Sequence, residues 1–521
     1  MPFAPKPNSA LLIVGHGSTE NPDSSTPYFE HADEIRKRGL FAEVHCCFWK
    51  EEPSMREALY MIDAEEVYIV PDFISEGYFT QDVIPREFGI TGPTTLVGGK
   101  ILHYCLPVGV HPSMNGIILL RAREVAPGID PAETTLIITG HGTGLNQNST
   151  KAIRDQVDQI IASNEGFKHV TDAFMEEEPL IAGWDEMSPT PNVIVVPFFI
   201  SDGLHSYQDI PVLLGIESEV GAAASQREVF RHNPHHLRGK TLYYSSAIGT
   251  ERLIADVILD QISDFDNQYK PQEFSRSSTI FPEESITHYL TRLLEKKVHR
   301  IGEIEIQTGA SCEQLCEQIG EQPCEQLFIL SHERDASNVR SGEVSAFEIH
   351  RDPMAARDLS TYAPDGEYRF TKGQVNLRAG WVMILSSAED LRLALDHFYP
   401  AAIGLHKASA SGKLAVQNLR EKLERQTGMY RSARFISDAG AQQLVRETCG
   451  PTNQCAKRIL WQLDGNTALE DSEASRFDGI SSGLPGTEAI PLLCQEACNH
   501  FVSQCRKVSK KEHDAKKLSA S

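Results

Sequence analysis

The chain carries the same series of motifs twice, in the same order, and this duplication constrains its fold more than any other feature. Three pairs of segments match: SALLIVGHGST (9–19) with TTLIITGHGTG (134–144), CFWKEEP (47–53) with AFMEEEP (173–179), and GKILHYCLPVG (99–109) with GKTLYYSSAIG (239–249). A unit of about one small domain is therefore repeated. At 521 residues the chain is also too long for a single hydrophobic core.

Each repeat alternates short apolar runs, such as LLIV, VYIV, LIIT and VIVV, with segments of helical spacing. These runs are apolar throughout, which suits parallel strands covered on both faces by crossover helices. The sequence predicts an α/β fold with two tandem flavodoxin-like parallel-sheet units, at 8–128 and 132–264, followed by α+β C-terminal domains.

Polar motifs follow the predicted strands of both repeats. They are Gly15-His16-Gly17, Gly140-His141-Gly142, the acidic run Glu176 to Glu178, and the turn from Asp202 to His205. Taken singly, each is better explained as a tight turn or a loop histidine. In open α/β sheets, however, ligands bind beyond the carboxyl ends of the strands. Two histidines and an acidic cluster at different strand ends of one sheet therefore favour a metal or acid-base site.

The first repeat lacks most of this set. It keeps His16, but our alignment places Tyr78 opposite His205 and Lys50 opposite Glu176. A lysine cannot replace a carboxylate as a cation ligand at neutral pH. We therefore expect the first repeat to be a degenerate half with a structural or substrate-binding role.

The charge balance limits the partners. Lys plus Arg number 49 and Asp plus Glu 72, a net charge of -23, which disfavours nucleic acid and anionic membranes. The N-terminus lacks a signal-peptide pattern and no long apolar run follows, so we expect a cytoplasmic protein with no membrane partner. Eleven cysteines without a secretion signal favour metal or redox chemistry over disulfides.

Both repeats resemble the sirohydrochlorin cobalt and iron chelatases, relatives of ferrochelatase that insert a divalent metal into a tetrapyrrole. The motifs that carry the resemblance are GHG[ST], Phe-x-Glu with a following Pro, and PFFISDGLHSYQDIP (197–211). The resemblance implies that His141 and His205 bind the incoming metal and assist removal of the pyrrole protons. It also implies a catalytic glutamate at a strand end, for which Glu176 is the nearest match and Glu177 the alternative.

The chemistry agrees with these residue types. A flat macrocycle must lose two N–H protons while a divalent cation loses its waters, and neutral imidazole is both a base and a ligand. Imidazole suits Co, Fe, Ni and Zn alike, so the sequence leaves the choice between Co(II) and Fe(II) open.

The C-terminal half has no third copy of the repeat. We expect an intervening domain at 275–375 and a cysteine-rich domain at 376–507. Cys312 and Cys316 stand one helical turn apart, but buried helix thiols are the better interpretation and no metal is assigned there.

Four cysteines form two close pairs in the last domain: Cys449, Cys455, Cys494 and Cys498. Four thiolates suit zinc or an iron-sulfur cluster. The spacing Cys-x5-Cys, 38 residues, Cys-x3-Cys is similar to the 4Fe-4S ligand pattern of sulfite and nitrite reductases, which makes the cluster our first choice and zinc the second. Cys505 is then a spare thiol, and ordinary buried thiols are the alternative for all four.

The order of the parts resembles a bacterial group of two-unit chelatase-like proteins with an appended iron-sulfur domain, in which the middle segment is regarded as stabilising. The polar, basic tail at 508–521 is predicted to be disordered. The leading function is a sirohydrochlorin chelatase of the lyase class. The alternatives are a tetrapyrrole or metal carrier, and an iron-sulfur redox protein that acts on a bound tetrapyrrole and has a redox partner.

Overall fold

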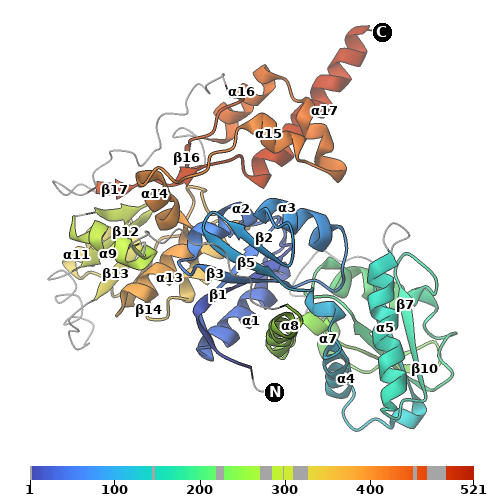
Figure 1. Cartoon of the computed structure of the whole chain (residues 1–521). Coiled ribbons are helices and arrows are strands. Elements are labelled where there is room, and N and C mark those ends of the chain that lie inside the picture. The colour runs from blue at the N-terminus through green and yellow to red at the C-terminus, as the bar shows by residue number, and fades with distance from the viewer. Residues whose placement is uncertain are drawn as a thin grey trace. The chain divides into compact units, whose positions relative to one another are not determined.

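The computed structural model describes residues 3–142, 147–218, 228–269, 284–296, 298–308, 327–449, 455–465 and 488–520. The chain divides into two compact units (Figure 1). Unit 1 comprises Met1–Phe48 and Ala64–Arg276, and unit 2 comprises Trp49–Asp63 and Ser277–Ser521. The short segment Trp49–Asp63 therefore belongs to the C-terminal unit, although its sequence lies within the predicted first repeat.

The two repeats in unit 1 form five-stranded sheets of the same topology. The first has the order β2-β1-β3-β5-β4 and the second β7-β6-β8-β10-β9. In each, the last-named strand is antiparallel and the others are parallel. The strands are β1 (Lys6–Gly15), β2 (Phe41–Phe48), β3 (Glu66–Pro71), β4 (Thr94–Val97), β5 (Lys100–Tyr104), β6 (Thr134–Gly140), β7 (His169–Phe174), β8 (Asn192–Pro197), β9 (His235–Leu237) and β10 (Lys240–Tyr244). The predicted tandem parallel-sheet fold is confirmed.

Helices of the two repeats lie between the strands and cover the sheets. They are α1 (Thr26–Lys37), α2 (Met55–Ala58), α3 (Ile84–Phe88), α4 (Met114–Val125), α5 (Gln147–Ser163), α6 (Ile210–Leu214), α7 (Glu228–Arg231) and α8 (Ile254–Gln268). Of these, α2 lies in the segment that belongs to unit 2. The central strands β1 and β6 are buried along most of their length, as their apolar runs predict.

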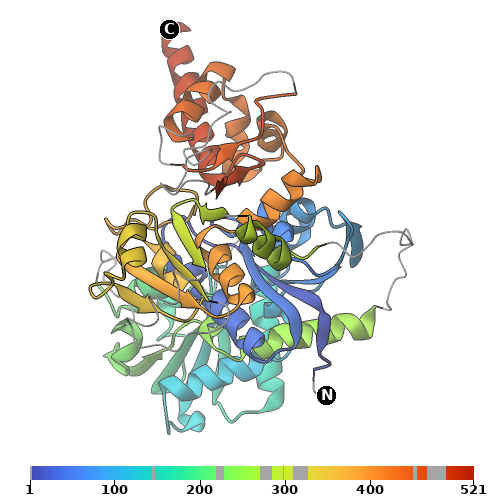
Figure 2. The ribbon, with the colours of Figure 1, turned by 90° about the vertical axis from the view of Figure 1, so that its left-hand side faces the viewer.

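The last helix of each repeat packs against the other repeat (Figure 2). Helix α4 contacts α5 and β8, and α8 contacts α1 and β3. Ile118 of α4 and Ile258 of α8 are fully buried in one core that contains residues of both sheets. The Gln261 amide of α8 also donates to the Pro107 carbonyl at 2.7 Å. The repeats therefore share one hydrophobic core, to which each contributes a helix.

Unit 2 contains a mixed six-stranded sheet in the order β14-β15-β13-β12-β11-β17. Its strands are β11 (Val298–Ile301), β12 (Ile304–Thr308), β13 (Phe328–His332), β14 (Glu348–His350), β15 (Trp381–Leu385) and β17 (Glu488–Ile490). Its helices are α9 (Ile286–Glu295), α11 (Ala336–Ser341), α12 (Ala355–Thr361), α13 (Ala388–Phe398) and α14 (Ala402–Ala410). The boundary we predicted at 375/376 falls inside this domain, because β15 lies between β13 and β14 and its Trp381 is fully buried.

The remainder of unit 2 is a small, mainly helical domain. Its elements are α15 (Leu419–Glu424), the 3-10 segment η9 (Gly428–Phe435), α16 (Asp438–Thr448), the paired strands β16 (Arg458–Ile459) and β18 (Leu493–Cys494), and α17 (Asn499–Ala520). Trp461 and Phe501 lie at the centre of its core.

The tail predicted to be disordered is instead the continuation of α17 as far as Ala520. One reason is that the Glu512 carboxylate accepts a hydrogen bond of 3.0 Å from the Ser437 amide, at the N-terminus of α16. Cys312 and Cys316 lie outside the described residues. Among the described helices, none is long and apolar enough to cross a membrane.

Candidate functional site

The Gly-His-Gly turn places His141 at the carboxyl end of β6. Gly142 has φ of +66°, a left-handed conformation that L side chains rarely adopt. A Cβ atom on Gly142 would also lie 2.7 Å from the Phe174 Cβ atom. Glycine is therefore required at this position, and the turn it permits directs the adjacent histidine out of the strand end.

His205 begins a short π-helix, η7 (His205–Asp209), which follows β8. Single π-helical turns occur often at functional sites. The His205 Nδ1 atom lies 2.6 Å from the Asp209 Oδ2 atom, across one turn of this element. The preceding turn is fixed by Asp202, whose carboxylate accepts a hydrogen bond of 2.8 Å from the Ala247 amide.

The structure brings His141 and His205 together. Their ring centroids lie 5.0 Å apart with an angle of 80° between the planes. The side chains are 36% and 46% exposed, so a ligand in solution has access to both. Two imidazoles at this separation, with open faces, are suited to bind one metal ion between them.

The hydrogen bonds of both histidines fix the nitrogen that carries the proton. The His141 Nδ1 atom lies 3.0 Å from the Gly142 carbonyl oxygen, and the His205 Nδ1 atom faces the Asp209 carboxylate. These oxygens only accept, so each Nδ1 atom donates its hydrogen. In the neutral tautomer this leaves the Nε2 lone pair of each ring for a metal ion or a proton.

The two candidate glutamates have different surroundings. The Glu176 Oε2 atom lies 3.7 Å from the His141 Nδ1 atom, and its side chain is 62% exposed. The Glu177 carboxylate accepts a hydrogen bond from the Thr150 hydroxyl of α5. A Cβ atom on Gly142 would lie 2.6 Å from the Glu177 Cγ atom, so Glu177 is packed beneath the turn. The geometry favours Glu176 as the carboxylate of the site.

In the first repeat, Phe79 occupies the place that we assigned to Tyr78. Phe79 begins η3 (Phe79–Val83), the π-helix that corresponds to η7. Its ring lies 4.9 Å from that of His16 with an interplanar angle of 80°, close to the geometry of the histidine pair. The assignment of Tyr78 was wrong by one residue, because the matching segments share their ends only when Phe79 aligns with His205.

Lys50, which we placed opposite Glu176, has its contacts in unit 2. It belongs to the segment of unit 2, where its Nζ atom contacts the Tyr430 hydroxyl at 2.8 Å and lies 4.5 Å from the centroid of that ring. The second repeat has two histidines and a glutamate at its site. The first repeat keeps only His16 of this set, because Phe79 replaces the second histidine and Lys50 replaces the glutamate.

The first repeat forms a hydrogen bond to the π-helix that carries His205 in the second repeat. The Asn21 amide donates a hydrogen bond to the Tyr207 hydroxyl, two residues after His205. Sequence analysis missed Asn21, Tyr207 and Asp209. Only Asp209 had a visible signal, since a carboxylate four residues after a histidine reaches it across one helical turn.

A second candidate site lies in unit 2, where the four predicted cluster cysteines line one cavity of about 110 Å³. Cys449 follows α16, Cys455 precedes β16, Cys494 is in β18 and Cys498 precedes α17. Such a cavity far exceeds the space needed for one water molecule. Within the described ranges, no set of three or more His, Cys, Asp or Glu side chains converges to hold a single metal ion.

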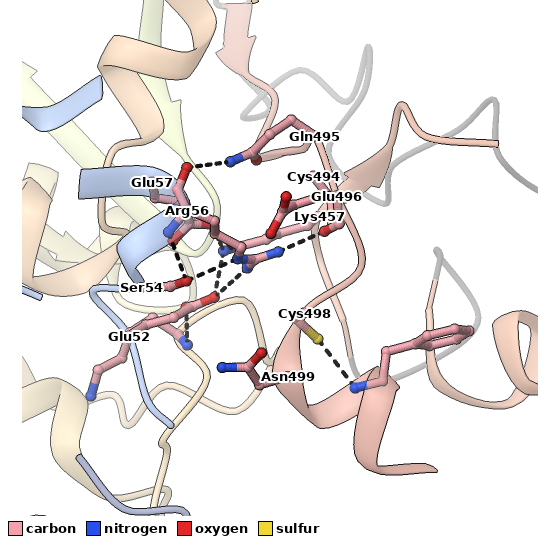
Figure 3. A network of polar contacts seen from close by, with 12 residues as sticks. Glu52, Ser54, Arg56, Glu57, Lys457, Cys494, Gln495, Glu496, Cys498 and Asn499 are labelled. Carbon is pink, nitrogen blue, oxygen red and sulfur yellow. Dashed lines mark hydrogen bonds and ion pairs between the residues drawn. The ribbon is translucent and has the colours of Figure 1, made fainter. Parts of the chain in front are cut away.

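Buried charged residues from two distant segments adjoin this cavity (Figure 3). The Lys457 Nζ atom lies 2.8 Å from Glu52 and 3.1 Å from Glu57, and the Arg56 guanidinium lies 3.1 and 3.0 Å from the same two carboxylates. Burial opposes ionisation of Glu52, but Lys457 and Arg56 outweigh it and lower its pKa to about 2. Burial dominates at Glu57 and raises its pKa.

The thiols at the cavity fit an anionic cluster. Burial raises the pKa of Cys449 and Cys498, and that of Cys455 to about 12, so the free thiols hold their protons at neutral pH. A 4Fe-4S cluster takes thiolate ligands, and loading it would release these protons. The Arg56 and Lys457 cations beside the cavity suit the negative charge that the four thiolates then carry.

Three protein families match consecutive parts of the chain. Residues 10–125 and 135–265 match CbiX, residues 293–409 match the DR2241 stabilising domain, and residues 411–507 match a 4Fe-4S iron-sulfur cluster binding domain. The last match supports a 4Fe-4S cluster as the cofactor of this part of the chain.

Relatives and a solved structure agree with these matches. A probable sirohydrochlorin cobaltochelatase of Halobacterium salinarum is 41% identical over 273 residues, which are 49% of this chain and 91% of that protein. A sirohydrochlorin cobaltochelatase of Methanosarcina barkeri is 29% identical over 136 residues, 25% of this chain and 94% of the relative.

The crystal structure of DR2241 from Deinococcus radiodurans is described as a multi-domain protein with structural similarity to chelatases and two additional novel domains. The match covers 96% of this chain and 99% of the DR2241 chain, with a TM-score of 0.73 and 25% sequence identity. The shared architecture therefore extends over both units. The chain belongs to the sirohydrochlorin cobaltochelatase (CbiX) family, with two chelatase repeats followed by a stabilising domain and a 4Fe-4S domain.

Proposed function

We propose that the protein inserts Co(II) or Fe(II) into a sirohydrochlorin-like tetrapyrrole at the histidine pair of the second repeat. The observation that carries this proposal is the pair His141 and His205, whose rings lie 5.0 Å apart. Membership of a family whose named relatives are sirohydrochlorin cobaltochelatases supports the substrate class. In this role the protein is a lyase whose partner is the tetrapyrrole. We expect it to act in the cytoplasm, without nucleic acid or membrane.

The two Nε2 atoms act first as metal ligands. Their lone pairs are available because Gly142 and Asp209 hold the Nδ1 hydrogens. Each imidazole replaces a water of the incoming cation and holds it against the face of the macrocycle. The contact of 2.6 Å between His205 and Asp209 keeps one ring oriented.

Protons must leave as the metal enters. Two pyrrole N–H bonds break, the divalent metal binds all four ring nitrogens in place of its former ligands, and two protons are released for each metal inserted. As the metal moves to the ring nitrogens, the freed imidazoles accept these protons. Glu176, 3.7 Å from His141 and largely exposed, passes them to solvent.

The 4Fe-4S cluster is expected at Cys449, Cys455, Cys494 and Cys498, where it supplies one-electron chemistry or a covalent tie between segments. The insertion chemistry proposed above uses neither, since metal insertion moves protons but no electrons.

The test is anaerobic incubation of the purified protein with sirohydrochlorin and Co(II) or Fe(II), followed by absorption spectroscopy. We expect insertion by the wild type and none by the His141→Ala, His205→Ala double variant. Phe79→Leu, which changes the matching position of the first repeat, is the control and is expected to retain insertion. Tight binding of the tetrapyrrole without insertion by the wild type would overturn the proposal in favour of a carrier.

A further inference from the structure

We propose that Arg56 is part of the iron-sulfur site and that its buried positive charge raises the reduction potential of the cluster. The proposal rests on a cluster held by the four cysteines. It concerns a residue outside the 4Fe-4S domain, more than 350 residues before its first cysteine in the sequence.

Arg56 lies in the segment Trp49–Asp63. The matching run of the second repeat has a different place in the structure. That run contains Glu176, beside His141. In the first repeat this run belongs to unit 2, where helix α2 begins after the capping residue Ser54. The Arg56 side chain is 4% exposed and lines the cysteine cavity together with Cys494 and Cys498.

Arg56 binds the loop between these two cysteines through both its side chain and its backbone (Figure 3). Its guanidinium donates to the Glu496 carbonyl at 2.6 Å, and its backbone carbonyl accepts a hydrogen bond of 3.2 Å from the Gln495 amide. The Cys494 Sγ atom also contacts the Glu496 carbonyl, at 3.1 Å. The guanidinium and a ligand sulfur therefore share one backbone oxygen.

The charged residues around the cavity differ in their charge state and in their position relative to the cysteine sulfurs. Glu52 is ionised at neutral pH, and burial favours the neutral form of Glu57. The Arg56 guanidinium keeps its positive charge at neutral pH and lines the cavity beside Cys494 and Cys498. Its permanent charge thus acts on two of the four thiolates.

The effect on the cluster follows from Coulomb's law. A 4Fe-4S core with four thiolates is anionic, and reduction adds another negative charge. A nearby cation stabilises the reduced form more than the oxidised form. This difference is large where water is excluded, because the effective dielectric constant is low. Removal of the Arg56 charge should therefore make the cluster harder to reduce.

Three single variants of the whole chain test this. Arg56→Gln removes the cation, Glu52→Gln removes a buried anion of the same cavity, and Lys50→Gln removes a cation of the same segment that does not line the cavity. After anaerobic purification, iron and sulfide are measured per chain, and the midpoint potential is obtained by redox titration with detection by electron paramagnetic resonance.

We expect Arg56→Gln to reduce the equilibrium constant for reduction about tenfold or more, which is about 59 mV toward negative potential for one electron. Glu52→Gln should shift the potential in the opposite direction, and Lys50→Gln should leave it unchanged. Opposite signs are a signature of charge, since loosened packing has no reason to produce them.

The proposal is wrong if Arg56→Gln and Glu52→Gln move the potential in the same direction, or if neither moves it. If Arg56→Gln fails to hold a cluster, Glu52→Gln decides the matter alone, and an unchanged or lowered potential overturns the proposal. Wild-type protein without iron and sulfide would refute the cluster assignment itself, a result separate from any potential shift.

Discussion

Phe79 packs edge-on against His16 with ring centroids 4.9 Å apart, the arrangement that His205 has with His141. The π-helix and the angle between the rings are the same in both repeats, but an apolar ring replaces the second imidazole. A phenyl ring preserves the packing of the turn and provides no lone pair. The first repeat has therefore kept the shape of the site while losing its chemistry.

Asp209→Asn should slow metal insertion about ten- to hundredfold, because removal of a carboxylate behind a ligand histidine usually weakens metal binding by this factor. The asparagine still contacts the His205 Nδ1 atom but carries no charge. Initial rates with sirohydrochlorin and Co(II), over a range of metal concentrations, measure the change. Asp82→Asn, which removes an exposed carboxylate from the corresponding π-helix of the first repeat, is the control. Equal rates for wild type and Asp209→Asn would argue against His205 as a metal ligand.

Glu176→Gln and Glu177→Gln should have different consequences. The first removes the exposed carboxylate near His141 and should lower the insertion rate about a hundredfold, the lower part of the range for general acid-base catalysis. The second weakens the hydrogen bond from Thr150 and should cost about 1 kcal/mol of stability with little loss of rate. Parallel rate assays and thermal unfolding separate the two. A larger loss of rate at Glu177 would reverse their roles.

The parts of the site that could be predicted are those that depend on short sequence patterns. The strand runs before His141 and before His205, the glycines of the turn and the repeat itself indicated both the fold and the convergence of the histidines. The choice between Glu176 and Glu177 could not be predicted, because it depends on where Thr150 of α5 lies.

Other features depend on contacts distant in sequence. The repeats share one core through α4 and α8, and no spacing indicates that a helix packs on a neighbouring sheet rather than its own. The position of Arg56 beside Cys494 and Cys498 could not be predicted either. Arg56 follows the motif CFWKEEP (47–53), which the sequence indicates to be part of the repeat. The tail was predicted to be disordered from its composition, which gave no sign that Glu512 would bond to Ser437.

Cys455→Ser should abolish the iron-sulfur chromophore, whereas Cys505→Ser should retain it. Both thiols are in the last domain, but Cys455 lines the cavity and Cys505 is a fully buried member of the apolar core. Visible absorption, with iron and sulfide analysis after anaerobic purification, measures the cluster. Loss of the chromophore in both variants would mean that Cys505 is also required for the site.

His31 should make the stability of unit 1 depend on pH below neutrality. Its ring lies on α1, is buried, and has its Nε2 atom 2.8 Å from the Gly249 carbonyl of the other repeat. Burial lowers the pKa of His31 from 6.5 to about 4. The folded chain therefore keeps the ring neutral at pH values where the unfolded chain binds a proton. The stabilisation is complete above pH 6.5 and is lost as the pH falls toward 4, by about 3 kcal/mol in all.

The comparison of wild type with His31→Gln isolates this contribution, because glutamine keeps an N–H donor for Gly249 but does not titrate. Hydrogen exchange of the α1 amides, followed by mass spectrometry from pH 7 to pH 4 and corrected for intrinsic rates, measures local opening. The wild type should lose protection relative to the variant as the pH falls, since only the opened histidine takes up a proton. A difference between the two proteins that stays constant over this range would mean that His31 binds a proton as readily in the folded as in the unfolded chain.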